Sequence, residues 1–112
     1  MDDIKFEFRD IDYQGTFPQS YVLDLYAYYP YTVSGITIQG SGYTTSDLSY
    51  FDIVINNTTV TGLATLTATT TIQHYYSTAL NSVNIGDEVF LNITSVSGEP
   101  KIIRGKIKIN KT

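Results

Sequence analysis

The side chains that carry most protein chemistry are scarce in this sequence. His74 is the single histidine and cysteine is absent, which excludes a histidine- or cysteine-based metal cluster. No serine lies in the strand-turn-helix context of a nucleophile elbow. Asp87-Glu88 could ligate calcium, but no spaced acidic loop surrounds the pair, so two acids in a turn are the simpler interpretation. We therefore expect no enzyme, no cofactor and no bound metal.

Tyrosine carries the strongest functional signal, since the chain has ten tyrosines and no tryptophan. Four of them flank Pro30: Tyr26, Tyr28, Tyr29 and Tyr31. A tyrosine ring offers a large contact area with a polar tip, which suits a protein interface and also suits stacking on a sugar. Tyrosine equally fits the half-buried faces of strands. We predict an interface role for this cluster, with ordinary sheet packing as the alternative.

The net charge of −4 is unevenly distributed along the chain. Five of the eleven acids, including Asp2 and Asp3, lie in the first twelve residues, and five of the seven bases, including Lys106 and Lys108, lie in the last twelve. These charges either solvate and protect sheet edges, or they attract the termini to each other within one chain or between neighbours. Opposite charges across a strand pair contribute only about 0.2–1 kcal/mol, so they select partners rather than drive folding. We place these four residues at an interface.

Length and composition define the class of protein. The 112 residues form one domain, 1–112, in which we expect residues 1–20 to serve as an attachment arm or edge strand. The acidic, alternating start is unlike a signal peptide, and no apolar run approaches the roughly 20 residues of a membrane span. The basic tail has no interleaved aromatic residues, which argues against nucleic-acid binding. We expect a soluble protein that is made in the cytoplasm and binds neither membrane nor nucleic acid.

Strands must position these side chains, because apolar and polar residues alternate with period two through most of the chain. Alternation predicts strands over residues 4–8, from Tyr21 to Ala27 and around Val33–Ile38. Residues 51–55 follow, ending in an Asn56-Asn57 turn, and residues 62–74 show the longest alternation. We predict an all-β antiparallel β-sandwich of about seven or eight strands, jelly-roll or immunoglobulin-like, without a substantial helix. A small closed barrel is the alternative.

The stretch from Asn84 to Asn110 is the most strongly patterned part of the sequence. A Gly86-Asp87 turn precedes one alternating run, and Gly98-Glu99-Pro100 separates it from a second. Two such runs joined by a short turn predict a β-hairpin with which the rest of the chain pairs. Its apolar face, which we assign to the core, contains Val89, Leu91, Ile93, Ile103, Ile107 and Ile109.

A series of short motifs occurs in a recognisable order between Val33 and Ile109. An alternating strand ends in an Asn turn (Ile53–Thr58), and a Val-Thr-Gly-Leu step follows at Val60–Leu63. Thr78-Ala79 and the Gly86-Asp87 turn come next. This order resembles small β-sandwich domains of tailed-bacteriophage virion proteins. The chain departs from that pattern at Asn57, where those domains usually have glycine, and its first thirty residues have no clear counterpart.

The resemblance implies a non-enzymatic structural protein located in the virion. It would be a capsid auxiliary or decoration protein, or a unit of a head fibre or tail appendage. The implied partners are capsid or appendage proteins of the same virion, and we expect a homo-oligomer. A carbohydrate-binding module that uses the Tyr26–Tyr31 cluster is the alternative, with a glycan as its partner.

Overall fold

The computed structural model describes residues 3–42, 44 and 46–112, and within them every regular element is a β-strand. The ten strands are β1 (Ile4–Phe8), β2 (Gln19–Asp24), β3 (Tyr31–Gly42), β4 (Leu48–Ile55), β5 (Thr58–Thr59), β6 (Leu66–Ala68), β7 (Gln73–Tyr76), β8 (Ser82–Val83), β9 (Val89–Ser97) and β10 (Pro100–Lys111). Two of them, β5 and β8, are only two residues long, which accounts for most of the excess over the predicted seven or eight.

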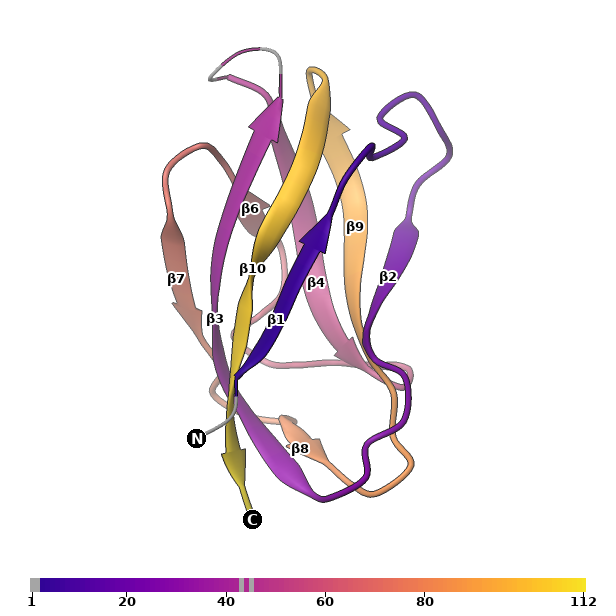
Figure 1. The fold of residues 1–112 in the computed structure, drawn as a ribbon, viewed down its shortest axis with the longest axis vertical. Coiled ribbons are helices and arrows are strands. Elements are labelled where there is room, and N and C mark those ends of the chain that lie inside the picture. Colours follow the sequence, from indigo (N-terminus) through magenta and orange to yellow (C-terminus); the bar gives the residue numbers. More distant parts are fainter. Residues whose placement is uncertain (1–2, 43, 45) are drawn as a thin grey trace.

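The strands form two sheets that pack face to face (Figure 1). Sheet A has the order β1-β10-β3-β7, with β8 also paired to β3. Sheet B has the order β2-β9-β4-β5, with β6 also paired to β4. All of these pairings are antiparallel. The predicted antiparallel β-sandwich is confirmed.

The pairing follows the jelly-roll scheme. β1 pairs with β10, β2 with β9, β3 with β7 and β4 with β5, so the chain forms one long antiparallel ribbon that folds over itself. The successive pairs alternate between the two sheets: β1/β10 and β3/β7 lie in sheet A, and β2/β9 and β4/β5 lie in sheet B. The far end of the ribbon is the predicted Asn56-Asn57 turn, where Asn56 has a φ of 54°. Asparagine tolerates this left-handed conformation better than most residues.

The core lies between the sheets and is made of inward-facing apolar residues from both. The six residues predicted to form the apolar face of Asn84–Asn110 are each at most 1% exposed. Phe51 and Ile53 of β4 and Ile36 and Ile38 of β3 face them from the same interior. The assignment of these alternating positions to the core is therefore confirmed.

The predicted hairpin between β9 and β10 is wrong. β9 lies in sheet B between β2 and β4, whereas β10 lies in sheet A between β1 and β3. The turn at Gly98, which has a φ of 77°, carries the chain from one sheet to the other instead of returning it along the same sheet. An inward-facing alternation looks the same in either sheet, so local pattern could not distinguish a hairpin from a crossing. The two strands are nevertheless central in their sheets.

The long strand predicted over residues 62–74 is also wrong. The chain turns at Gly62 (φ 92°) and Thr65 (φ 54°), forms the short β6 in sheet B, and then crosses to β7 in sheet A. The carboxylate of Asp52 accepts a hydrogen bond of 2.7 Å from the Thr65 backbone N–H and so holds the turn. Ile72, an apolar residue within this alternating stretch, is exposed at the crossing.

The strand predicted from Tyr21 to Ala27 ends early. β2 stops at Asp24, and Leu25 is 71% exposed instead of facing the core. Ala27 is buried, but its burial comes from contact with the turn at Gly86-Asp87 and not from a strand. Residues 25–30 therefore form a loop, which carries three of the four clustered tyrosines.

Candidate interaction surfaces

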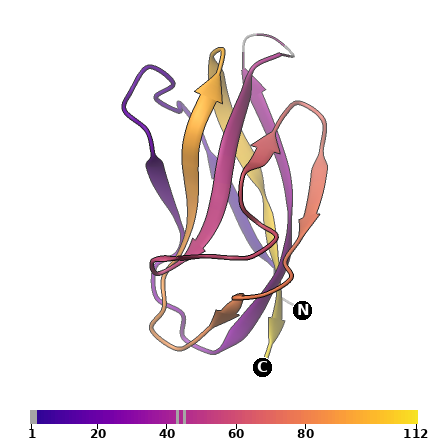
Figure 2. The same cartoon turned by 180° about the vertical axis from the view of Figure 1, so that it is seen from behind.

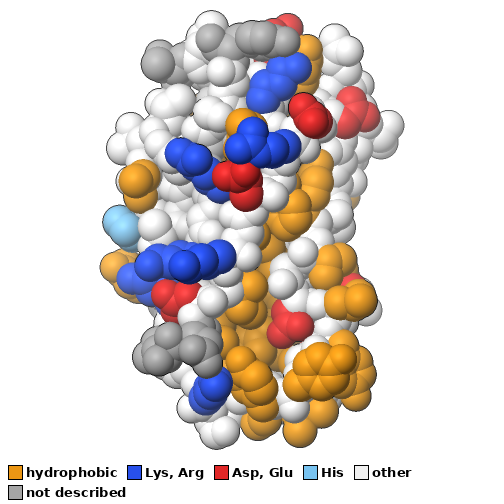
Figure 3. Space-filling view, viewed as in Figure 1, with side chains coloured by type: hydrophobic (Ala, Val, Ile, Leu, Met, Phe, Trp, Pro, Cys, Tyr) orange, Lys and Arg blue, Asp and Glu red, His pale blue; other side chains and the backbone are white. Residues whose placement is uncertain are grey.

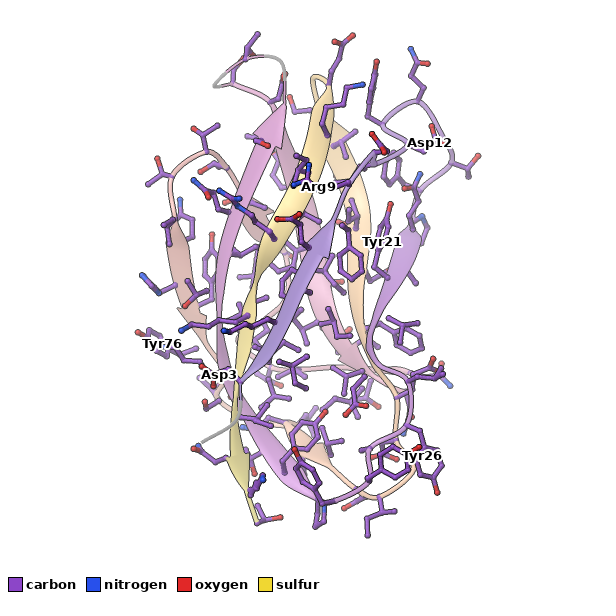
Figure 4. All side chains as sticks on the ribbon, in the orientation of Figure 1. Asp3, Arg9, Asp12, Tyr21, Tyr26 and Tyr76 are labelled. Carbon is purple, nitrogen blue, oxygen red and sulfur yellow. The ribbon has the colours of Figure 1, made fainter. Side chains whose placement is uncertain are left out.

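The tyrosine loop, defined here as residues 25–30, lies at the end of the sandwich where Tyr26 is marked in Figure 4. Two backbone hydrogen bonds hold it to the Gly86-Asp87 turn. The Ala27 N–H donates to the Asp87 carbonyl (3.0 Å), and the Gly86 N–H donates to the Ala27 carbonyl (2.8 Å). Gly86 has a φ of 91°, which glycine adopts without strain. The loop is thus fixed by a turn some sixty residues away in sequence.

The structure brings the four predicted tyrosines together but gives them two different roles. Tyr28 is 82% exposed, and Tyr26 and Tyr29 are also exposed. The rings of Tyr26 and Tyr28 contact each other with centroids 5.3 Å apart, and those of Tyr29 and Tyr31 are 6.0 Å apart. Tyr31 is only 2% exposed, so it is a core residue.

Tyr31 anchors the base of the cluster. Its hydroxyl donates a hydrogen bond of 2.8 Å to the Asp24 carboxylate. Burial raises the pKa of Tyr31, and the hydrogen bond to Asp24 raises it further. The hydroxyl is therefore already bonded within the chain, while Tyr31 still contributes to the wall of the hollow beside the exposed tyrosines.

The exposed rings border a shallow hollow of about 260 Å³, whose other walls are Ile4, Leu23, Asp24 and Tyr31. Exposed Leu25 and Ile85 extend the apolar surface at this end. Figure 3 shows apolar side chains gathered at this lower end and continuing upward as a band near the middle of the view. We call the exposed residues Leu25, Tyr26, Tyr28, Tyr29 and Ile85 the tyrosine end.

The predicted charge pairing between the termini occurs within the chain. β1 pairs with β10 in register, and Lys106 Nζ lies 3.7 Å from a carboxylate oxygen of Asp3. Lys108 Nζ lies 6.0 Å from the centre of the Tyr76 ring. Both lysines project from the outer face of sheet A, and Asp2 lies outside the described residues. The Lys106–Asp3 pair is partly exposed, so it stabilises the strand pairing by less than about 1 kcal/mol.

All seven Lys and Arg residues lie on β1, β10 or the residue after β1. Blue side chains accordingly gather over these strands in Figure 3. None of the strands of sheet B contains a cationic residue. In the sequence, acids and bases are separated between the two ends of the chain. In the folded protein, the cations lie on the side of β1 and β10, whereas the strands of sheet B carry none.

His74 and Asp87 also form hydrogen bonds within the chain. His74 Nδ1 and Thr37 Oγ1 form a hydrogen bond of 2.9 Å on sheet A. Asn56 Nδ2 donates to the Asp87 carboxylate (3.0 Å), and the Asn84 N–H also donates to it (2.8 Å). These two bonds, the first most strongly, lower the pKa of Asp87. Across the described residues, no three metal-ligating side chains are grouped, and no helix has the length and apolarity to cross a membrane.

A second hollow, which the sequence did not reveal, lies on the outer face of sheet B (Figure 2 brings this sheet to the front). It measures about 390 Å³, and Phe90 contributes an aromatic side chain to it. Its walls come from β2, β4, β5 and β9, which are dispersed over seventy residues. The one signal in the sequence for this hollow was Phe90. It lies between the core positions Val89 and Leu91, so alternation places its aromatic side chain on the outer face of the sheet.

No known family, curated protein or solved structure matches this chain.

Proposed function

We propose that this chain is a non-enzymatic structural protein of a bacteriophage virion that binds the capsid shell or a neighbouring fibre through its tyrosine end. The order of motifs from Val33 to Ile109, which resembles virion β-sandwich domains, supports this role. The jelly-roll strand order adds support because viral capsid proteins use it widely. A fold alone does not define a function, so the proposal depends on the surface.

The observation that carries the proposal is the exposed apolar surface at the tyrosine end. Leu25, Tyr28 and Ile85 are each more than 60% exposed and lie on adjoining loops. Grouped apolar side chains on a soluble domain mark interaction sites, and tyrosine is enriched at protein interfaces. The backbone hydrogen bonds to Gly86 and Asp87 order the loop before binding, which lowers the entropy lost on association.

The outer face of sheet A has a smaller part in this proposal. Asp3 and Lys106 pair with each other within the chain, which leaves them less free to pair with a partner. Self-association is part of the proposed role, because a protein that covers a symmetric shell meets identical sites. The tyrosine end and the apolar band beside it are the surface for both contacts.

Sedimentation tests the proposal. The purified protein is centrifuged alone and together with assembled shells of the capsid protein from the same phage. We expect an oligomer that cosediments with shells, and at least ten-fold weaker binding for Leu25→Ala/Tyr28→Ala, in line with the loss of central interface residues. Tyr76→Ala, which truncates an exposed tyrosine on β7, is the matched control and binds as wild type. A monomer that associates with no virion component would refute the role.

A further inference from the structure

An apolar row crosses the outer face of sheet B, and part of this row lines the hollow. Phe90 of β9 lies opposite Val22 of β2 on one side and Val54 of β4 on the other, so the three form one row across the sheet. Phe90 and Val54 line the hollow and are only half-buried. This row presents a flat apolar strip with an aromatic ring at its centre.

Neutral hydrogen-bonding groups border the strip. In the next row, Ser20 lies opposite Asn92, and the Ser20 hydroxyl donates to the Asn92 side-chain oxygen at 3.1 Å. This bond orients the amide and leaves its N–H donors for a ligand. Asn57 adds a second exposed amide from the β4–β5 turn.

The turn that presents Asn57 is held rigidly by its neighbour. Asn56 accepts a hydrogen bond of 3.0 Å from the Glu88 N–H while it donates to Asp87. The polar rim is therefore largely preorganised, and preorganised polar groups give a binding site its specificity.

Charge restricts the ligand. None of the described residues that line the hollow is ionised, and every Lys and Arg lies on the β1/β10 side of the molecule. The two acids in the strands of sheet B are engaged: Asp24 accepts from Tyr31, and Asp52 accepts from Thr65. An anionic polymer finds no cation here, so the uncharged lining complements an uncharged ligand.

We propose that the outer face of sheet B binds a neutral saccharide in the hollow beside Phe90. A pyranose ring carries C–H groups on its faces and hydroxyls around its rim. Phe90 and Val54 contact the C–H face, while Asn92, Asn57 and Ser20 bind the hydroxyls. The hollow, at about 390 Å³, falls within the roughly 300–1,000 Å³ typical of small-molecule sites.

This saccharide site differs from the carbohydrate site that the sequence suggested at the Tyr26–Tyr31 cluster. No amide side chain lines the 260 Å³ hollow there, and its carboxylate, Asp24, already accepts from Tyr31. Saccharide binding on sheet B is also independent of shell binding by the tyrosine end. Either can fail while the other holds.

Titration of the ¹⁵N-labelled protein by NMR tests the proposal. The probes are four neutral disaccharides (cellobiose, maltose, lactose and N,N′-diacetylchitobiose) and two acidic oligosaccharides (digalacturonate and trigalacturonate), each to about 20 mM. We expect at least one neutral probe to shift the backbone amides of Phe90, Asn92 and Asn57. The acidic probes should leave these amides unchanged.

Variants then locate the site. Phe90→Ala should weaken binding of the neutral probe at least ten-fold, and Asn57→Ala, in an exposed turn, should weaken it several-fold even if Phe90→Ala folds poorly. Tyr28→Ala is the control and should bind as wild type. The proposal is overturned if no neutral probe binds, if the shifts centre on residues 26–30, or if Asn57→Ala binds as tightly as wild type.

Discussion

Asn56 and Asp87 are 31 residues apart in sequence, yet the Asn56 amide donates a hydrogen bond of 3.0 Å to the Asp87 carboxylate. The bond joins the turn at the far end of the jelly-roll ribbon to the turn that supports the tyrosine loop. A further backbone bond of 2.8 Å, from the Asn56 N–H to the Glu88 carbonyl, runs beside it. The Asn56-Asn57 turn borders the hollow on sheet B and the Gly86-Asp87 turn supports the tyrosine loop, so each candidate binding surface contacts one of two linked turns.

Two substitutions of Asn56 distinguish the contribution of its side-chain hydrogen bonds to stability from the contribution of its backbone conformation. Asn56→Gly removes two side-chain hydrogen bonds and should lower the free energy of unfolding by about 1–2 kcal/mol. Asn56→Ala loses the same bonds but keeps a Cβ at a φ of 54°, so it should be about 1 kcal/mol less stable than Asn56→Gly, in which glycine adopts this conformation without strain. Urea denaturation measures both variants. Equal destabilisation by Asn56→Gly and Asn56→Ala would contradict the expected energetic cost of the left-handed conformation at residue 56.

Asp87 should make stability depend on pH in the acid range. Its pKa is lowered in the folded state, so its stabilising contribution is complete above the unfolded value of about 3.9 and is lost as pH falls through the lower folded value. Asp87→Asn should therefore lower the Tm by a few degrees at pH 6 and by much less near pH 2. The carboxylate is exposed, so the effect is small.

Asp10→Asn serves as the control for the pH experiment. Asp10 is exposed and has a φ of 57°, a conformation that asparagine also tolerates. Thermal unfolding followed by circular dichroism from pH 2 to pH 7 compares the two variants with wild type. If Asp87→Asn and wild type keep a constant difference in Tm across this range, the linkage is refuted.

Removing the Tyr31 hydroxyl should destabilise the protein, whereas removing that of Tyr28 should not. Tyr31→Phe leaves the Asp24 carboxylate without its 2.8 Å donor, at a cost of about 1–2 kcal/mol. Tyr28→Phe changes a hydroxyl on an exposed ring and should stay within about 0.5 kcal/mol of wild type. Urea denaturation of both variants checks the contrast, and a similar midpoint for the two would count against the anchoring role of Tyr31.

Gly105 should tolerate no side chain. A Cβ there would lie 2.0 Å from the Thr37 backbone carbonyl oxygen on β3, so the central β10–β3 pairing would have to shift. We expect Gly105→Ala to cost more than about 2 kcal/mol. Asn110→Ala, at the exposed end of the same strand, is the control and should cost less than about 0.5 kcal/mol. A Gly105→Ala protein with wild-type stability would show that β10 lies differently against β3.

The sequence by itself determined which residues face the core within most strands. Period-two alternation is a local property, so Leu91, Ile103 and Ile107 were assigned to the interior without knowledge of any partner strand. The Asn56-Asn57 turn was predictable for the same reason, because a left-handed turn depends on the residues that form it. These local signals were sufficient to predict an antiparallel sandwich.

Tertiary structure decided which strands pair and therefore which surfaces exist. Alternation is identical for a strand in either sheet, so β9 and β10 could not be assigned to opposite sheets from their pattern. The hollow beside Phe90 brings Ser20, Val54 and Asn92 together only after β2, β4 and β9 pair. Pairing between distant segments is selected by packing of the whole core, and no local stretch of sequence contains that information.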